Sequence, residues 1–145
     1  MEAPSVSNTD RMLTYHAAAA ALPREQIVKE IEGSRRKYES VGGSSARIQL
    51  ILARLALHGD ARERDKALEL LQLQLSSKDD IDTGMTALLQ LLRTILVENR
   101  QLESSLKAQR EKLKEESKRA EALKQKLDAL VEAERKLQER NRPKQ

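Results

Sequence analysis

The sequence contains no cysteine, phenylalanine or tryptophan, and its only phenol side chains are those of Tyr15 and Tyr38. The absence of cysteine excludes disulfides, thiolate nucleophiles and thiolate metal ligands. Because aromatic side chains supply much of the buried area in most cores, any core here must be built from Leu, Ile, Val and Ala. Five glycines and three prolines leave few places for turns. This composition predicts long helices and an all-α fold.

Long apolar runs are also absent. No stretch approaches the roughly 20 apolar residues that span a membrane, and residues 1–4 lack the basic and apolar regions of a signal peptide. The net charge of +4 is distributed unevenly: residues 1–97 carry 13 Lys+Arg and 13 Asp+Glu, whereas residues 98–145 carry 14 and 10. Because both signs are interspersed in the C-terminal part, a nucleic-acid partner is not expected.

The larger part of the chain is predicted to be a small helical head, residues 9–97, preceded by a disordered lead-in, residues 1–8. Thr9 or Asp10 is expected to cap a first helix that ends near residue 22. The predicted apolar face of this helix carries one leucine and three alanines: Leu13, Ala17, Ala20 and Ala21.

Three more helices are predicted in the head. Pro23 begins one over residues 24–40, and the next, about residues 45–57, is the most apolar. Gly59 is placed to end that helix, and Asp60 is placed to cap the fourth. Because few residues separate the third and fourth helices, they should pack as an antiparallel hairpin. A pair of such hairpins would resemble a tetratricopeptide-type stack.

A last helix is predicted from about Asp82 onward, and its C-terminal part, residues 98–142, is expected to form a basic coiled-coil arm. With Met85 at heptad position a, apolar residues recur at spacings of three and four, the pattern of a seam that packs on another helix. At about 1.5 Å per residue the helix would be on the order of 85–90 Å long. Between Thr86 and Val97 apolar residues surround the helix, so this segment is expected to be buried in the head.

The seam of the arm is the predicted partner-binding site. It consists of Leu106, Leu113, Ala120, Leu123, Leu127, Leu130 and Leu137. The basic residues predicted to flank it are Lys124, Lys126, Arg135 and Lys136. Three polar residues, Asn99, Gln109 and Glu116, interrupt the seam, which weakens its middle and restricts its register. Three uses of the seam stay open: a homodimeric coiled coil, packing on a partner or back on the head, and a free single helix.

No residue is assigned a catalytic, cofactor-binding or metal-binding role. His16 and His58 lack convergent partners in the sequence, so a structural role is expected for both. Asp79, Asp80 and Asp82 lack the twelve-residue loop of a calcium site and fit a helix cap better. The sequence also lacks a phosphate-binding glycine loop and a nucleophile motif. A protein that is not an enzyme and needs no cofactor is therefore predicted.

Several segments together resemble one family, the QseG-like outer-membrane lipoproteins associated with a bacterial sensor kinase and response regulator operon. These segments are residues 13–16 (LTYH), 46–56 (ARIQLILARLA), 65–71 (DKALELL), 123–137 (LKQKLDALVEAERKL) and 139–143 (ERNRP). The resemblance implies a lipid-anchored protein at the periplasmic face of the outer membrane. It also implies that the protein binds the periplasmic sensor domain of a histidine kinase and promotes two-component signalling.

The signal peptide and lipidated cysteine of that family are missing from this sequence, which is therefore expected to be the mature portion. Membrane attachment would depend on the anchor that is absent here. The expected function is that of an accessory protein that binds a sensor kinase through helical contacts. The alternative is a homodimeric coiled-coil scaffold or adaptor without a kinase partner. A third possibility, a basic nucleic-acid binder, is disfavoured by the interspersed acidic residues.

Overall fold

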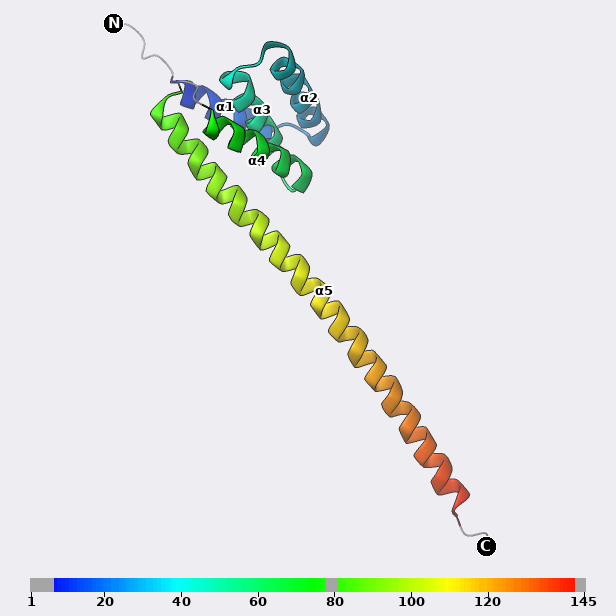
Figure 1. The fold of residues 1–145 in the computed structure, drawn as a ribbon. Helices are drawn as coiled ribbons and strands as arrows, with labels where there is room; N and C mark the ends of the chain where they lie inside the picture. The colour runs from blue at the N-terminus through cyan, green and yellow to red at the C-terminus, as the bar shows by residue number, and fades with distance from the viewer. Residues whose placement is uncertain (1–6, 78–80, 143–145) are drawn as a thin grey trace, which may run out of the picture. The chain divides into compact units, whose positions relative to one another are not determined.

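A computed structural model describes residues 7–77 and 81–142, and the regular elements in these ranges are all helices (Figure 1). The helices are α1 (Asn8–Ala20), α2 (Arg24–Val41), α3 (Ser44–Ala56), α4 (Ala61–Ser76) and α5 (Thr83–Arg140). The predicted all-α fold, with a small helical head and a long C-terminal helix, is confirmed.

The chain divides into two compact units, an N-terminal unit (Met1–Asn99) and a C-terminal unit (Arg100–Gln145). Helices α1 to α4 belong to the N-terminal unit, and α5 begins there and continues through the C-terminal unit. The first residues of α5 therefore belong to a packed core, whereas its remaining residues form a unit of their own.

The ends of the short helices follow from local chemistry. Ser7, rather than the predicted Thr9 or Asp10, caps α1, and its Oγ accepts a hydrogen bond from the Asp10 amide at 3.1 Å. The predicted lead-in therefore ends before residue 7, and residues 1–6 lie outside the described residues. Asp60 caps α4 as predicted, since its Oδ1 accepts from the Glu63 amide at 3.1 Å. Side-chain acceptors of this kind satisfy amides that have no partner inside the helix.

Three glycines form the turns on either side of α3. Gly42 and Gly43, with φ of 70° and 87°, separate α2 from α3, and Gly59, with φ of 82°, lies between α3 and α4. Positive φ is strained for a residue with a Cβ, so glycine is the residue that these turns require. The predicted place of Gly59, after the end of the third helix, is therefore confirmed.

Helix α3 is the central helix of the N-terminal unit (Figure 1). It packs against α1, α2 and α4, and the predicted antiparallel hairpin of α3 and α4 is confirmed. Helices α1 and α2, in contrast, contact each other only slightly. The suggested stack of two hairpins is therefore wrong. The physical reason is that α3 is apolar on nearly every side, so three neighbours are needed to cover it.

Two apolar clusters hold the unit together. One joins α3, α4 and the start of α5 and includes Ile51 and Leu71, both completely buried. The other joins α1, α2 and α3 and includes Ala19 of α1. The buried face of α1 carries Ala19, with Met12 and Tyr15 partly buried beside it. The predicted face around Leu13 is therefore wrong. Leu13 is exposed, and its neighbour Met12 packs against the core in its place.

The start of α5 packs into the first cluster along one face only. Met85, Leu89 and Leu96 are buried there, at positions that share one side of a helix. Leu91 and Ile95, in contrast, are 57% and 44% exposed. The prediction that this segment is buried all round is therefore only half right. The core covers one face, and the apolar residues on the other face remain in contact with solvent.

Candidate helix-binding surface

The predicted seam residues all lie on α5 within the C-terminal unit, and every described residue from 100 to 142 is exposed. The six seam leucines are between 48% and 67% exposed, and Ala120 is exposed as well. These leucines are Leu106, Leu113, Leu123, Leu127, Leu130 and Leu137. Because α5 has no interruption between Thr83 and Arg140, their heptad spacing places them along one continuous stripe.

A stripe of this kind costs free energy while it faces water. Single exposed leucines are ordinary on protein surfaces, but contiguous apolar surface on an exposed element marks sites of interaction. The densest part is the segment Leu123–Leu130, where apolar residues follow one another at spacings of four and three. The helix therefore places these separated apolar residues next to one another on one face. This stripe is the strongest candidate for a functional surface.

The four basic residues predicted to flank the seam divide into two pairs. Lys124 and Lys126 occupy heptad positions e and g, directly beside the seam. Arg135 and Lys136 occupy positions b and c, which point away from it. Arg135 also forms ion pairs with Glu132 at 2.8 Å and with Glu139 at 3.7 Å on its own helix. The helical geometry thus supports only Lys124 and Lys126 as direct neighbours of a docked partner.

Polar side chains divide the stripe. Gln109 and Glu116 occupy successive d positions and are exposed, so the apolar surface between Leu106 and Leu123 is narrower than the surface beyond it. A partner helix that covered Glu116 would have to supply a polar or basic group opposite it, because an unpaired buried carboxylate is costly. This residue therefore restricts which helices can dock in register.

A second candidate surface is an apolar groove of ≈ 310 Å³ in the N-terminal unit. Its walls come from α1, from α3 and the turn after it, from α4 and from the start of α5, and they include Leu13, Leu55 and Ile95. At its edge His16 Nδ1 lies 3.0 Å from the backbone oxygen of Leu52, which gives this histidine a structural partner. Sequence reasoning missed the groove because its residues come from four separate segments. Leu13 and Ile95 are apolar residues that remain exposed, and only the packing of the folded chain determines this exposure.

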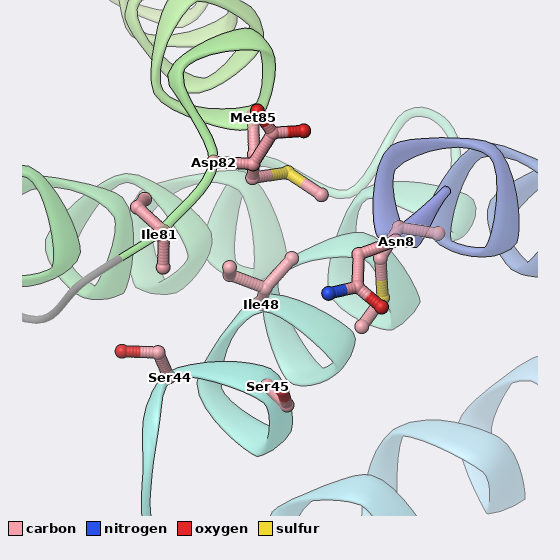
Figure 2. Close-up of a pocket in the computed structure, with 8 residues that line it drawn as sticks. Asn8, Ser44, Ser45, Ile48, Ile81, Asp82 and Met85 are labelled. Carbon is pink, nitrogen blue, oxygen red and sulfur yellow. The ribbon is translucent and has the colours of Figure 1, made fainter.

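A smaller pocket of ≈ 190 Å³ lies where α1, α3 and α5 begin. Figure 2 shows Asn8, Ser44, Asp82 and Met85 arranged around Ile48. Two of its polar side chains, those of Asp82 and Ser44, are already engaged within the protein. Asp82 Oδ1 accepts from the Gly84 amide at 3.2 Å, and Ser44 Oγ accepts from Gln74 Nε2 at 3.1 Å. Asp82 therefore acts in the predicted cap before α5, whereas Asp79 and Asp80 lie outside the described residues.

The perturbed ionisable groups of the N-terminal unit lie outside the groove. The Tyr15 hydroxyl donates to Glu30 Oε1 at 2.6 Å and lies 3.2 Å from Ser34 Oγ. Burial, and then the hydrogen bond to Glu30, raise the pKa of Tyr15 above its ordinary value. On the surface of α2, the Arg35 guanidinium hydrogen-bonds Glu32 and lowers the pKa of that carboxyl group. These groups connect helices or neighbouring turns, and none of them lines the groove.

Within the described ranges, no group of three or more His, Asp or Glu side chains is arranged to hold a metal ion. The same residues include no helix with the length and apolarity needed to cross a bilayer.

Comparison with known proteins gives no match for this chain among protein-family models, curated proteins or solved structures. The description of its function therefore depends on the surfaces described above.

Proposed function

We propose that this protein is a helical accessory protein, not an enzyme, that binds the helices of a partner through the leucine stripe of α5. The observation that carries the proposal is the exposure of that stripe, with its six leucines between 48% and 67% exposed along one uninterrupted helix. A 3.5-residue apolar period matches a partner helix that wraps around α5 with a left-handed supercoil.

The expected affinity is moderate. Covering one half-exposed leucine contributes on the order of 1 kcal/mol, and the sum over the stripe is set against the entropy lost on association. Once the apolar area that the partner helix buries is counted as well, the surplus corresponds to a dissociation constant on the order of micromolar or weaker. A complex of this strength is reversible, which suits a regulatory contact better than a permanent structural one.

For the partner, we propose the periplasmic sensor domain of a bacterial histidine kinase. The support for this identity is the resemblance of residues 13–16, 46–56, 65–71, 123–137 and 139–143 to the QseG-like lipoproteins. The corresponding location is the periplasmic face of the outer membrane. In the mechanism we propose, the stripe packs against helices of the sensor domain and shifts the geometry of the kinase dimer towards the signalling state. The same stripe would serve the second candidate, a homodimeric scaffold, if a second copy covered it.

Size-exclusion chromatography with light scattering tests the proposal. The full chain is analysed alone and then mixed with the periplasmic sensor domain of a histidine kinase from the same organism, at concentrations on the order of tens of micromolar. A new peak with the summed mass supports the kinase partner. Unchanged elution of both proteins contradicts it. A stable dimer mass of the chain alone, without kinase binding, favours the scaffold.

A further inference from the structure

The residues on either side of the stripe carry charge of one sign only. Between residues 105 and 133, heptad positions e and g are occupied by five basic, two apolar and two serine residues, and by no acidic residue. The basic residues are Arg110, Lys112, Arg119, Lys124 and Lys126. All five are exposed, and the continuous helix keeps them in phase with the leucines. A partner helix that covers the stripe must therefore pass between two basic rows.

Five of the six acidic residues of the same segment lie elsewhere on the helix. Glu111, Glu115, Glu121, Asp128 and Glu132 occupy positions b, c and f, on the side opposite the stripe. The sixth, Glu116, lies within the stripe itself at position d. Basic residues are present on that side too, so the outer face has mixed charge. Both signs of charge therefore occur on the outer face of this segment, whereas the charged residues that border the apolar stripe are all basic.

This border disfavours a second copy of the chain as the partner. In a parallel, in-register pair, position g of one helix faces position e of the next heptad on the other, so Arg119 would face Lys124 twice. In an antiparallel pair positions g face each other, which places Arg119 near Lys126 when Ala120 packs opposite Leu123. Like charges across a coiled-coil interface are destabilising and direct partner choice.

We propose that the stripe binds an acidic amphipathic helix of another protein, with Glu or Asp at the positions that flank its own apolar seam. This inference rests on the proposed function, since it assumes that the stripe is a docking surface, and it adds the chemistry of the partner. The basic border both attracts such a helix and disfavours a second copy of the chain on the stripe.

Two synthetic helical peptides test the proposal, each about four heptads long with Leu and Ile in its seam. One carries Glu at every e and g position and the other carries Lys. Binding of each to the full chain is measured by titration calorimetry. The Glu peptide is expected to bind at least about tenfold more tightly, because several modest ion pairs add. Raising the ionic strength from about 0.05 M to about 0.5 M should reduce that preference.

A charge-swapped variant, with Arg110→Glu, Lys112→Glu, Arg119→Glu, Lys124→Glu and Lys126→Glu, should prefer the Lys peptide instead. The matched control changes the same number of charges on the outer face: Lys107→Glu, Lys114→Glu, Lys118→Glu, Arg135→Glu and Lys136→Glu. It should keep the preference for the Glu peptide. Circular dichroism checks that both variants remain helical.

The outcomes separate this inference from the proposed function. Equal binding of both peptides to the unmodified chain overturns the acidic partner but leaves the docking stripe standing. A stable homodimer that binds neither peptide overturns the acidic partner in favour of the scaffold. A monomer that binds neither peptide overturns both proposals.

Discussion

Arg54 and Glu63 form an ion pair between α3 and α4, with 2.6 Å between Nη1 of Arg54 and Oε2 of Glu63. The two side chains are only 9% and 18% exposed, so water screens this pair little. Glu63 also lies in the first turn of α4, where Asp60 caps the helix. Glu63 therefore takes part both in the first turn of α4 and in the packing of α4 on α3. The hairpin is therefore set by a charge as well as by leucines.

The first prediction concerns this pair. Glu63→Ala should reduce the free energy of unfolding of the N-terminal unit by about 3 kcal/mol, because it leaves the Arg54 guanidinium buried without its counter-charge. The measurement is a urea titration followed by tyrosine fluorescence, since both tyrosines lie in this unit. Lys66→Ala removes a second cation near Glu63, a largely exposed side chain whose Nζ lies 3.9 Å from the Glu63 carboxylate. This control should change stability by less than about 0.5 kcal/mol.

The second prediction tests which face of α5 belongs to the core. Leu89, 1% exposed, packs in the cluster with α3 and α4, whereas Leu91 is 57% exposed. Leu89→Ala should reduce the free energy of unfolding by about 3 kcal/mol, because it leaves a cavity. Leu91→Ala should reduce it by less than about 0.5 kcal/mol. Urea titration of both variants decides the point, and equal losses would contradict the orientation of α5.

The third prediction concerns pH. The pKa of Tyr15 is raised in the folded state, so the folded chain holds the phenol proton more tightly than the unfolded chain. Its contribution to stability is therefore complete below the unfolded pKa of about 10 and is lost as the pH rises through the raised folded pKa. Tyr15→Phe should lack this loss. It should also reduce stability by about 1–2 kcal/mol at neutral pH, because Ser34 is buried beside the hydroxyl.

The measurement is a series of urea titrations between neutral and alkaline pH, followed by Tyr38 fluorescence in the variant. Parallel curves for the variant and the unmodified chain across the alkaline range would contradict the assignment. The difference between the two proteins isolates Tyr15 from the lysines that titrate over the same range.

The fourth prediction concerns the stripe. Leu127→Glu combined with Leu130→Glu should abolish binding of the sensor domain, because two charges replace the densest apolar segment. The urea transition of the N-terminal unit should stay unchanged. The matched control, Ala122→Glu with Ala129→Glu, adds the same charge at positions c, which face away from the stripe. Chromatography of each variant with the sensor domain measures binding. A weakened N-terminal unit in the leucine variant would mean that the stripe packs on it.

Much of the architecture could be predicted from local patterns. Gly59 predicted the end of α3, and Asp60 predicted the start of α4. The cap of α1 could not be chosen correctly, because Ser7, Thr9 and Asp10 are all good capping residues and only the folded chain selects one. The buried face of α1 was predicted wrongly for a similar reason, since its small apolar residues occur on several sides.

The two candidate surfaces also differ in whether the sequence could predict them. The leucine stripe could be predicted because heptad spacing has meaning along a single helix, without any tertiary contact. The groove near Leu13 and Ile95 could not, since its walls come from segments that are distant in the sequence. The heptad positions also show that Arg135 and Lys136 lie away from the stripe, although they are adjacent to Leu137 in the chain.

By itself the sequence determined that the chain is helical, where α5 runs without interruption, and which residues form its apolar stripe, because these depend on spacing within one element. Only the tertiary structure decided that α3 is the central helix and which face of α5 is buried. Those outcomes depend on competition between apolar faces for the same limited core. Packing decides which face is buried, as it does for Leu89 in the cluster with α3 and α4. The spacing of apolar residues along the sequence does not show which face that is.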